Sequence, residues 1–172
     1  MIFFLGSGAI VSIPIALFFE PSTTFLSNFF PHLEAEILAV AVLAPIIEEF
    51  AKAYPSFYRH GESQRSLFTM GFLVGLGFGI TEFFAYVVLL GVPWYVRVPG
   101  IFFHAALTST VAYGIAAKHY ATFYLVAVFL HFLVNFMAIL GAPILLYAFA
   151  LATAYAACFL LYSAASERVT DY

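Results

Sequence analysis

The feature that most limits how this chain can fold is a series of apolar runs, each long enough to cross a lipid bilayer as a helix. A spanning helix needs about 20 predominantly apolar residues, and short breaks with proline, glycine or charged residues separate the runs. The predicted helices cover residues 2–19, 36–54, 67–90, 99–117, 120–140 and the stretch from 141–143 onward. Because 65% of the residues are hydrophobic and 9% are charged, with a mean hydropathy of +1.04, we expect an all-α fold, a polytopic transmembrane helix bundle of about six helices.

Six crossings use the whole length of the chain, so we expect a single transmembrane helical domain over residues 1–172. The lone Cys158 rules out an internal disulfide and is most simply a packing residue. The net charge of -3, with no cluster of lysine and arginine, argues against a nucleic-acid partner.

The basic residues predict how the bundle is oriented. With six crossings, the side that holds both termini also holds most of the basic residues: Arg59, Arg65, Lys118 and Arg168. Arg97 lies on the opposite side. The positive-inside rule therefore places both termini in the cytoplasm.

Two adjacent carboxylates, Glu48 and Glu49, interrupt the second apolar run, with Lys52 close behind them. A charged side chain at membrane depth costs roughly 2.5 to 3.5 kcal/mol on insertion scales, so such residues usually face a bundle interior or a water-filled cavity. Spacings of four and three residues let Lys52 neutralise whichever carboxylate shares its face of the helix. One glutamate can then stay paired with Lys52 while the other takes up and releases a proton.

Further polar residues lie within the next three predicted helices. Glu82 continues a stripe of small residues, Gly71, Gly75 and Gly79, which we interpret as a close helix contact and not as a phosphate-binding loop. His104 lies on the fourth helix, and on the fifth His131 and Asn135 are one turn apart. An asparagine at that spacing can orient a histidine or bind a ligand. One membrane histidine can be structural, but the whole set is too costly to retain without a function.

Carboxylates beside imidazoles suit general acid and base chemistry, with a glutamate taking a proton from water while histidines bind the developing oxyanion. That chemistry is hydrolysis inside the membrane. The same atoms could instead hold zinc or another divalent ion, which accepts histidine nitrogen and glutamate oxygen. The candidate metal ligands are Glu49, Glu82, His104 and His131. The residues alone leave both uses open.

Four ordered segments resemble the motifs of the PrsW family of intramembrane proteases. They are APIIEEFAK from Ala44, GLGFGITEFFAY from Gly75, FHAALTS from Phe103 and HFLVN from His131. The resemblance covers roughly residues 40–140, and the predicted catalytic core is approximately 36–140. The wider Abi superfamily includes the CAAX prenyl endopeptidases, in which the basic residue after the glutamate pair comes one position later than Lys52. The spacing here is closer to the PrsW branch.

The resemblance implies an intramembrane endopeptidase in which Glu48 or Glu49 activates water. It implies that His104, His131 and Asn135 polarise the scissile carbonyl, that Glu82 is a further essential acid and that Lys52 supports the glutamates. Family members have been described both as metalloproteases and as glutamate proteases, so the resemblance leaves open whether the protein binds a metal ion. The expected partner is a membrane-tethered protein or peptide, such as the anti-sigma factors that some bacterial members cleave, and the expected location is a prokaryotic plasma membrane.

One hypothesis from another class remains beside the protease. Buried carboxylates could bind protons or cations at the membrane midplane, as in a coupled carrier or a sensor. Such a protein should tolerate exchange of His104 and Asn135 if only carboxylates hold the ion, whereas a hydrolase should lose activity at every site residue.

Overall fold

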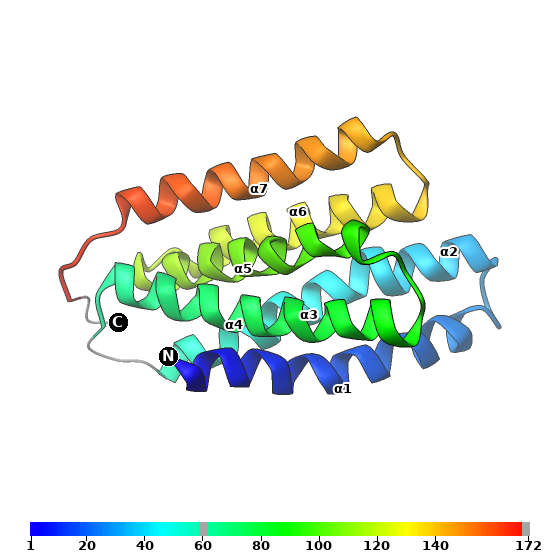
Figure 1. Cartoon of the computed structure of the whole chain (residues 1–172), viewed down its shortest axis with the longest axis horizontal. Helices are drawn as coiled ribbons and strands as arrows, with labels where there is room; N and C mark the ends of the chain where they lie inside the picture. Colours follow the sequence, from blue (N-terminus) through cyan, green and yellow to red (C-terminus); the bar gives the residue numbers. More distant parts are fainter. Residues whose placement is uncertain (59–61, 170–172) are drawn as a thin grey trace.

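The computed structural model describes residues 1–58 and 62–169, without the side chains of 15–20. Helices account for almost all of this part of the chain and run back and forth as an elongated bundle (Figure 1). The α-helices are α1 (Ile2–Leu26), α2 (His32–Glu36), α3 (Ala44–Ala53), α4 (Gln64–Phe84), α5 (Trp94–Ala116), α6 (Tyr120–Ile139) and α7 (Ile144–Ala164). Two π-helical segments, η1 (Ile37–Leu43) and η3 (Ala85–Leu89), and the 3-10 helix η2 (Tyr54–Tyr58) complete the set. The predicted all-α helical bundle is confirmed.

Within the described part of the chain, four helical segments are long and apolar enough to cross a membrane: Gln64–Leu89, Trp94–Ala116, Tyr120–Ile139 and Ile144–Ala164. Two further rods lie beside them, α1 and the continuous α2–η1–α3 segment (Figure 1). The protein is therefore an integral membrane protein. Crossings beyond those four stay a prediction.

The prediction of a loop between the first two helices, after residue 19 and before residue 36, is wrong in part. Residues 20–26, expected outside the helix, continue α1 to Leu26, and Pro14 and Pro21 lie inside it. Prolines are tolerated in membrane helices because neighbouring helices and local adjustments satisfy the freed backbone groups. The connection shrinks to residues 27–31, and α2 begins at His32 and not at residue 36.

Two other helices begin earlier than predicted. α4 begins at Gln64, since the hydroxyl of its N-cap Ser63 accepts a hydrogen bond from the backbone N–H of Ser66 (3.1 Å). α5 begins at Trp94, directly after Pro93, whereas Pro99, the predicted first residue, lies inside the helix. Either proline suits a helix start, so the sequence did not distinguish them. The correction places Arg97 within α5.

The glycine stripe of α4 makes the predicted close helix contact, and its partner is α5. A Cβ added at Gly75 would overlap the backbone oxygen of His104, and one at Gly79 would lie 2.7 Å from the Cα of Ile101. The other face of α4 is equally close to α1, because a Cβ at Gly77 would overlap the backbone oxygen of Leu5. The absence of side chains on both faces lets α4 lie between α1 and α5. Glu82 follows this stripe and meets α5 near His104.

The π-helical segments flank the acidic residues. η1 directly precedes α3, which carries Glu48 and Glu49, and η3 directly follows the part of α4 that carries Glu82. Single-turn π segments are frequent at functional sites because they shift the backbone register and leave carbonyl groups for other partners. One such carbonyl, that of Val40 in η1, accepts a hydrogen bond from Asn135 of α6 (2.9 Å).

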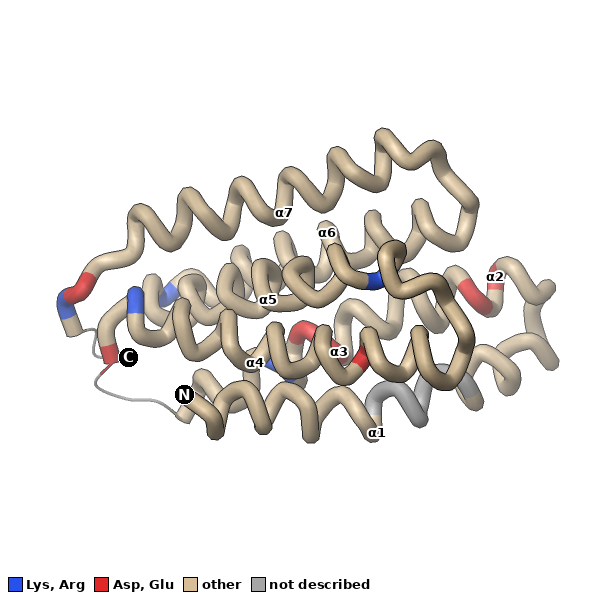
Figure 2. The backbone as a smooth tube through the Cα atoms, viewed as in Figure 1, with Lys and Arg blue, Asp and Glu red and all other residues tan. Residues whose placement is uncertain are grey.

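Charged residues gather at the ends of the bundle and in one patch at its centre (Figure 2). Met1, Arg65 and Glu167 line one cavity, so the two described ends of the chain lie at the same end of the bundle. Arg59, one of the residues used to predict the orientation, lies outside the described residues.

Candidate active site

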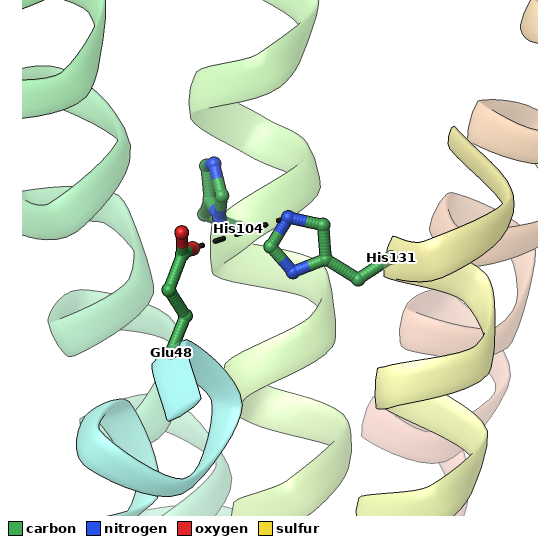
Figure 3. Close-up of side chains that lie close together, drawn as sticks. All are labelled: Glu48, His104 and His131. Atoms are coloured by element: carbon green, nitrogen blue, oxygen red, sulfur yellow. Dashed lines mark ion pairs between the residues drawn. The ribbon is translucent and has the colours of Figure 1, made fainter. Parts of the chain in front are cut away.

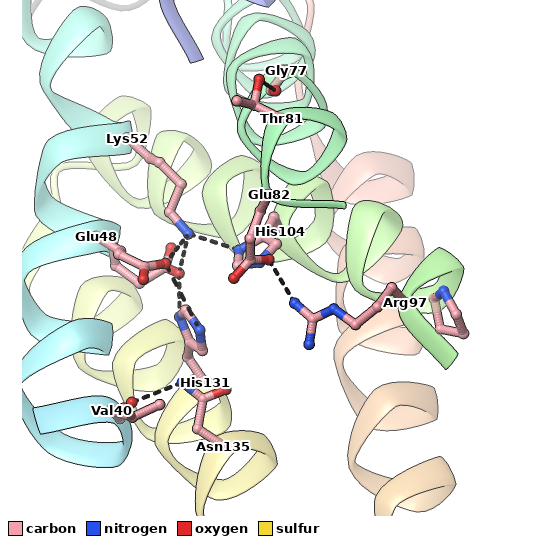
Figure 4. Close-up of polar contacts among 12 residues, drawn as sticks. Val40, Glu48, Lys52, Gly77, Thr81, Glu82, Arg97, His104, His131 and Asn135 are labelled. Carbon is pink, nitrogen blue, oxygen red and sulfur yellow. Dashed lines mark hydrogen bonds and ion pairs between the residues drawn. The ribbon is translucent and has the colours of Figure 1, made fainter. Parts of the chain in front are cut away.

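Four helices bring the predicted acids, histidines and lysine together at the centre of the bundle (Figure 4). They come from α3 (Glu48, Glu49 and Lys52), α4 (Glu82), α5 (His104) and α6 (His131). Glu49 and Lys52 are completely buried, and His104 and His131 are each 3% exposed. Charged groups removed from water to this extent must be satisfied by one another.

The ammonium group of Lys52 lies in the middle of this cluster. Its Nζ donates to Oε1 of Glu49 (2.6 Å) and to Nδ1 of His104 (3.0 Å), and lies 3.7 Å from Oε2 of Glu48. The ring of Phe78 lies 4.4 Å away, at cation–π distance. The predicted pairing of Lys52 with the glutamates is therefore present, and Lys52 also contacts a histidine from another helix.

The contacts of His104 fix which ring nitrogen carries its proton. An ammonium group has only donors, so Nδ1 of His104 accepts from Lys52. The hydrogen then resides on Nε2, which donates to Oε2 of Glu82 (2.7 Å). His104 is thus held between a cation on α3 and a carboxylate on α4.

His131 has a different arrangement. Its Nδ1 lies 2.8 Å from Oε1 of Glu49 and donates to that carboxylate. The other ring nitrogen, Nε2, is left facing Oε2 of Glu48 at 3.9 Å. That oxygen is buried and has no hydrogen-bond partner within the described residues. Two acceptor atoms therefore face each other across a space that a proton donor or a cation would satisfy.

Asn135 has a contact that its sequence position did not predict. Its amide donates to the backbone oxygen of Val40 (2.9 Å), which ties α6 to the π-helical segment η1 (Figure 4). The amide has a second hydrogen, which this contact leaves available.

Arg97 and Tyr86 also border the site, although neither was predicted to be a site residue. Nη2 of Arg97 lies 3.0 Å from Oε2 of Glu82, and the guanidinium carbon lies 3.8 Å from the centre of the Tyr86 ring. Arg97 was missed because the predicted fourth helix began after it. An arginine inside a membrane helix would have been a signal.

A group of three ligand atoms could hold a metal ion, one each from Glu48, His104 and His131, all within 4.8 Å of one another (Figure 3). This set contains Glu48, whereas the ligands predicted from the sequence beside the two histidines were Glu49 and Glu82. Glu49 bonds to His131 and Glu82 bonds to His104, which is how carboxylates orient metal-binding histidines. Three carboxyl groups also face two basic side chains here, Lys52 and Arg97.

The comparison with known protein families identifies the family of this chain. A family model described as "PrsW family intramembrane metalloprotease" matches residues 1–163. The chain belongs to the PrsW family. No curated protein and no solved structure matches it.

As a PrsW-family member the chain is an intramembrane protease, a hydrolase that acts on a protein substrate in a lipid bilayer. The match extends well beyond the segment from residue 40 to residue 140 that carried the resemblance, and it includes α1 and most of α7. The buried group of Glu48, His104 and His131 is compatible with the metalloprotease description of the PrsW family.

Proposed function

We propose that this protein cleaves a peptide bond of a membrane-tethered protein at the space between Glu48 and His131. The observation that supports this is the buried Oε2 of Glu48, which lacks a hydrogen-bond partner within the described residues and faces Nε2 of His131 at 3.9 Å. Both atoms are acceptors, so a water molecule placed there would direct its hydrogens at them. Such a water is positioned to lose a proton to Glu48 as it attacks a carbonyl.

Glu48, rather than its neighbour, is the proposed base. Oε1 of Glu49 already accepts from Lys52 and from His131, so the role we assign to Glu49 is to hold those two side chains. Burial keeps the surrounding dipoles and charges fixed, which strengthens their effect on a developing charge.

We propose Asn135 as a carbonyl-binding group, together with His131, which can donate from Nε2 once it holds a proton there. The N–H of His104 already donates to Glu82, so His104 supports the site through that contact and through Lys52. Asn135 uses one amide hydrogen on Val40 and keeps the other for the scissile carbonyl. Glu82 is the proposed acid that holds His104 through Nε2. These roles extend the resemblance onto the observed contacts.

A divalent ion fits the same residues. Glu48, His104 and His131 offer one oxygen and two nitrogens, the donor set that zinc prefers, and Oε2 of Glu48 has no competing hydrogen bond within the described part of the chain. When bound, such an ion supplies Lewis-acid activation of water and of the carbonyl. His104 can offer Nδ1 only if Lys52 moves away from it, because the ammonium group now occupies that lone pair.

The proposed setting is a prokaryotic plasma membrane with both termini in the cytoplasm. Arg65 lines the cavity at the end of the bundle that holds the described termini, and Arg168 follows Glu167, which pairs with Arg65. Lys118 follows the end of α5 that lies beside the start of α4, at the same end. This distribution supports the orientation under the positive-inside rule. We further propose that the chain forms one domain with a catalytic core at about residues 36–140. The proposed substrate is a single-span membrane protein such as an anti-sigma factor. The proposed wider relation is a distant one to the CAAX prenyl endopeptidases.

The test is hydrolysis of quenched fluorogenic peptides and of a membrane-anchored substrate library by the purified protein in lipid nanodiscs. Glu48→Gln should reduce the rate about 100-fold or more, because the amide fills the same volume but cannot take a proton. Glu34→Gln, which changes an exposed carboxylate of α2, should leave the rate unchanged. Equal rates for wild type and Glu48→Gln would refute the assignment.

A chelator added to the same assay separates the two ways of activating water. Loss of activity that zinc restores shows that an ion shares the site, and full activity shows that Glu48 acts alone. The family match favours a peptidase over the carrier or sensor alternative. Ion uptake into vesicles by a protein that cleaves nothing would reverse that preference.

A further inference from the structure

Arg97 reaches from the first turns of α5 to the carboxylate of Glu82 on α4. Its Nη2 lies 3.0 Å from Oε2 of Glu82, and the two side chains are 23% and 18% exposed. Both are therefore largely removed from solvent, where an ion pair is less screened than at a surface.

The same oxygen of Glu82 serves two donors. Oε2 accepts from Nη2 of Arg97 and from Nε2 of His104, which is 2.7 Å away. A carboxylate held by a single donor can rotate about its side-chain bonds, whereas two donors from different directions fix its plane. The position of the acceptor for His104 thus depends on Arg97.

Arg97 is itself held in place by Tyr86. The guanidinium carbon lies 3.8 Å from the centre of the Tyr86 ring, a stacking distance at which the cation is attracted to the ring face. Tyr86 lies in η3, the π-helical segment directly after Glu82. One short stretch of chain therefore supplies both the carboxylate that Arg97 pairs with and the ring that supports it.

We propose that Arg97 is a positioning residue for the active site, acting through Glu82 to hold the imidazole of His104 in its observed orientation. The proposal rests on the proposed function, in which His104 belongs to the active site. The contacts run in order from Tyr86 to Arg97, Glu82 and His104, and end at Lys52, which donates to Nδ1 of His104.

The first test is NMR of the full chain in nanodiscs with 15N-labelled histidine. In the wild type the Nε2 proton of His104, bonded to a carboxylate, should give a downfield signal that exchanges slowly with water. Arg97→Gln should move this signal upfield and speed its exchange. A His104→Gln spectrum assigns the signal.

The chain offers a matched control in Arg65. Its Nη1 lies 3.0 Å from Oε1 of Glu167, and its guanidinium carbon lies 5.2 Å from the Tyr162 ring, so it too combines a carboxylate and a tyrosine. This arginine is at the end of the bundle. Arg65→Gln should leave the His104 signal unchanged.

An unaltered His104 signal in Arg97→Gln would overturn the proposal. If that variant does not fold, Tyr86→Leu provides the test, because it removes the ring and keeps the charge. It should shift the same signal in the same direction, and no shift would overturn the proposal equally.

Kinetics give a second readout. Arg97→Gln should lower kcat about 10-fold to 100-fold, the usual effect of removing a group that orients an active-site histidine, and leave KM nearly unchanged. A change in KM alone would overturn the positioning role. If the protein cleaves no peptide, the proposed function fails, and the NMR result still shows whether Arg97 positions His104.

Discussion

Nδ1 of His131 donates to Glu49, and its Nε2 faces Glu48 at 3.9 Å, so one imidazole ring contacts both members of the glutamate pair. Adjacent residues on a helix point about 100° apart, and His131 from α6 lies where both can reach it. The two carboxylates thereby differ in environment. Oε1 of Glu49 accepts short hydrogen bonds from Lys52 (2.6 Å) and His131 (2.8 Å), whereas Oε2 of Glu48 lies 3.7 Å from Lys52 and 3.9 Å from His131. Oε2 of each glutamate is buried without a hydrogen-bond partner among the described residues.

This difference predicts unequal effects on stability. Glu49→Gln removes the anion that pairs with the fully buried Lys52, and breaking a buried pair in this way typically costs about 3 to 5 kcal/mol. Glu48→Gln removes a weaker contact and should cost much less. Thermal unfolding of both variants in the same detergent measures the difference, and equal midpoints would contradict the assignment of the structural role to Glu49.

In the proposed metal site, Lys52 would compete with a divalent ion for the same lone pair. The ammonium group lies 3.0 Å from Nδ1 of His104, so Lys52→Met should expose that nitrogen and tighten Co²⁺ binding about tenfold or more, roughly 1.4 kcal/mol. Absorption of bound Co²⁺ in the purified protein gives the affinity without any substrate. Lys118→Met, at the exposed turn after α5, is the control. Unchanged or weaker binding in Lys52→Met would show that Lys52 does not block the site.

The sequence was sufficient to predict the helices and most of the cluster because both follow from local rules. Apolar run length predicts membrane helices, and the cost of burying charge identifies Glu48, Glu49 and Glu82 as unusual wherever they lie. The small-residue stripe predicted that Glu82 faces a close helix contact; the structure shows that the partner helix is α5 and that Glu82 meets His104 there at 2.7 Å.

What the sequence did not predict depends on pairings between helices. Whether Glu48 or Glu49 faces a histidine depends on how α3 is rotated against α6, and η1 changes that rotation just before the pair. Arg97 was assigned to a loop because Pro93 and Pro99 are equally good helix starts. The contact of Asn135 with Val40 requires a carbonyl that a regular α-helix would have used.

Close packing at Gly75 should be essential for the site. A Cβ there would overlap the backbone of His104, so Gly75→Ala must push α4 from α5 and lengthen the contact of Glu82 with His104. Overpacking of this kind costs about 1 to 3 kcal/mol. Gly100→Ala on α5, where nothing lies within 4 Å of the added carbon, is the matched control. Both variants should be compared by thermal unfolding and by hydrolysis, and similar behaviour of the two would argue against this contact as a determinant of the site.

Asn135 can be tested against a residue that makes the same kind of contact without a proposed role in chemistry. Asn135 donates to the carbonyl of Val40 (2.9 Å), and Tyr124, also on α6, donates to that of Ile46 (2.8 Å). Asn135→Ala and Tyr124→Phe each remove one hydrogen bond between α6 and the α2–η1–α3 segment, so each should lower stability by about 0.5 to 1.5 kcal/mol. Only Asn135→Ala should also lower kcat, because its second amide hydrogen is the proposed donor to the scissile carbonyl, and loss of such a donor costs about 100-fold or more. Matching kcat values for the two variants, measured where both are folded, would assign Asn135 to helix packing alone.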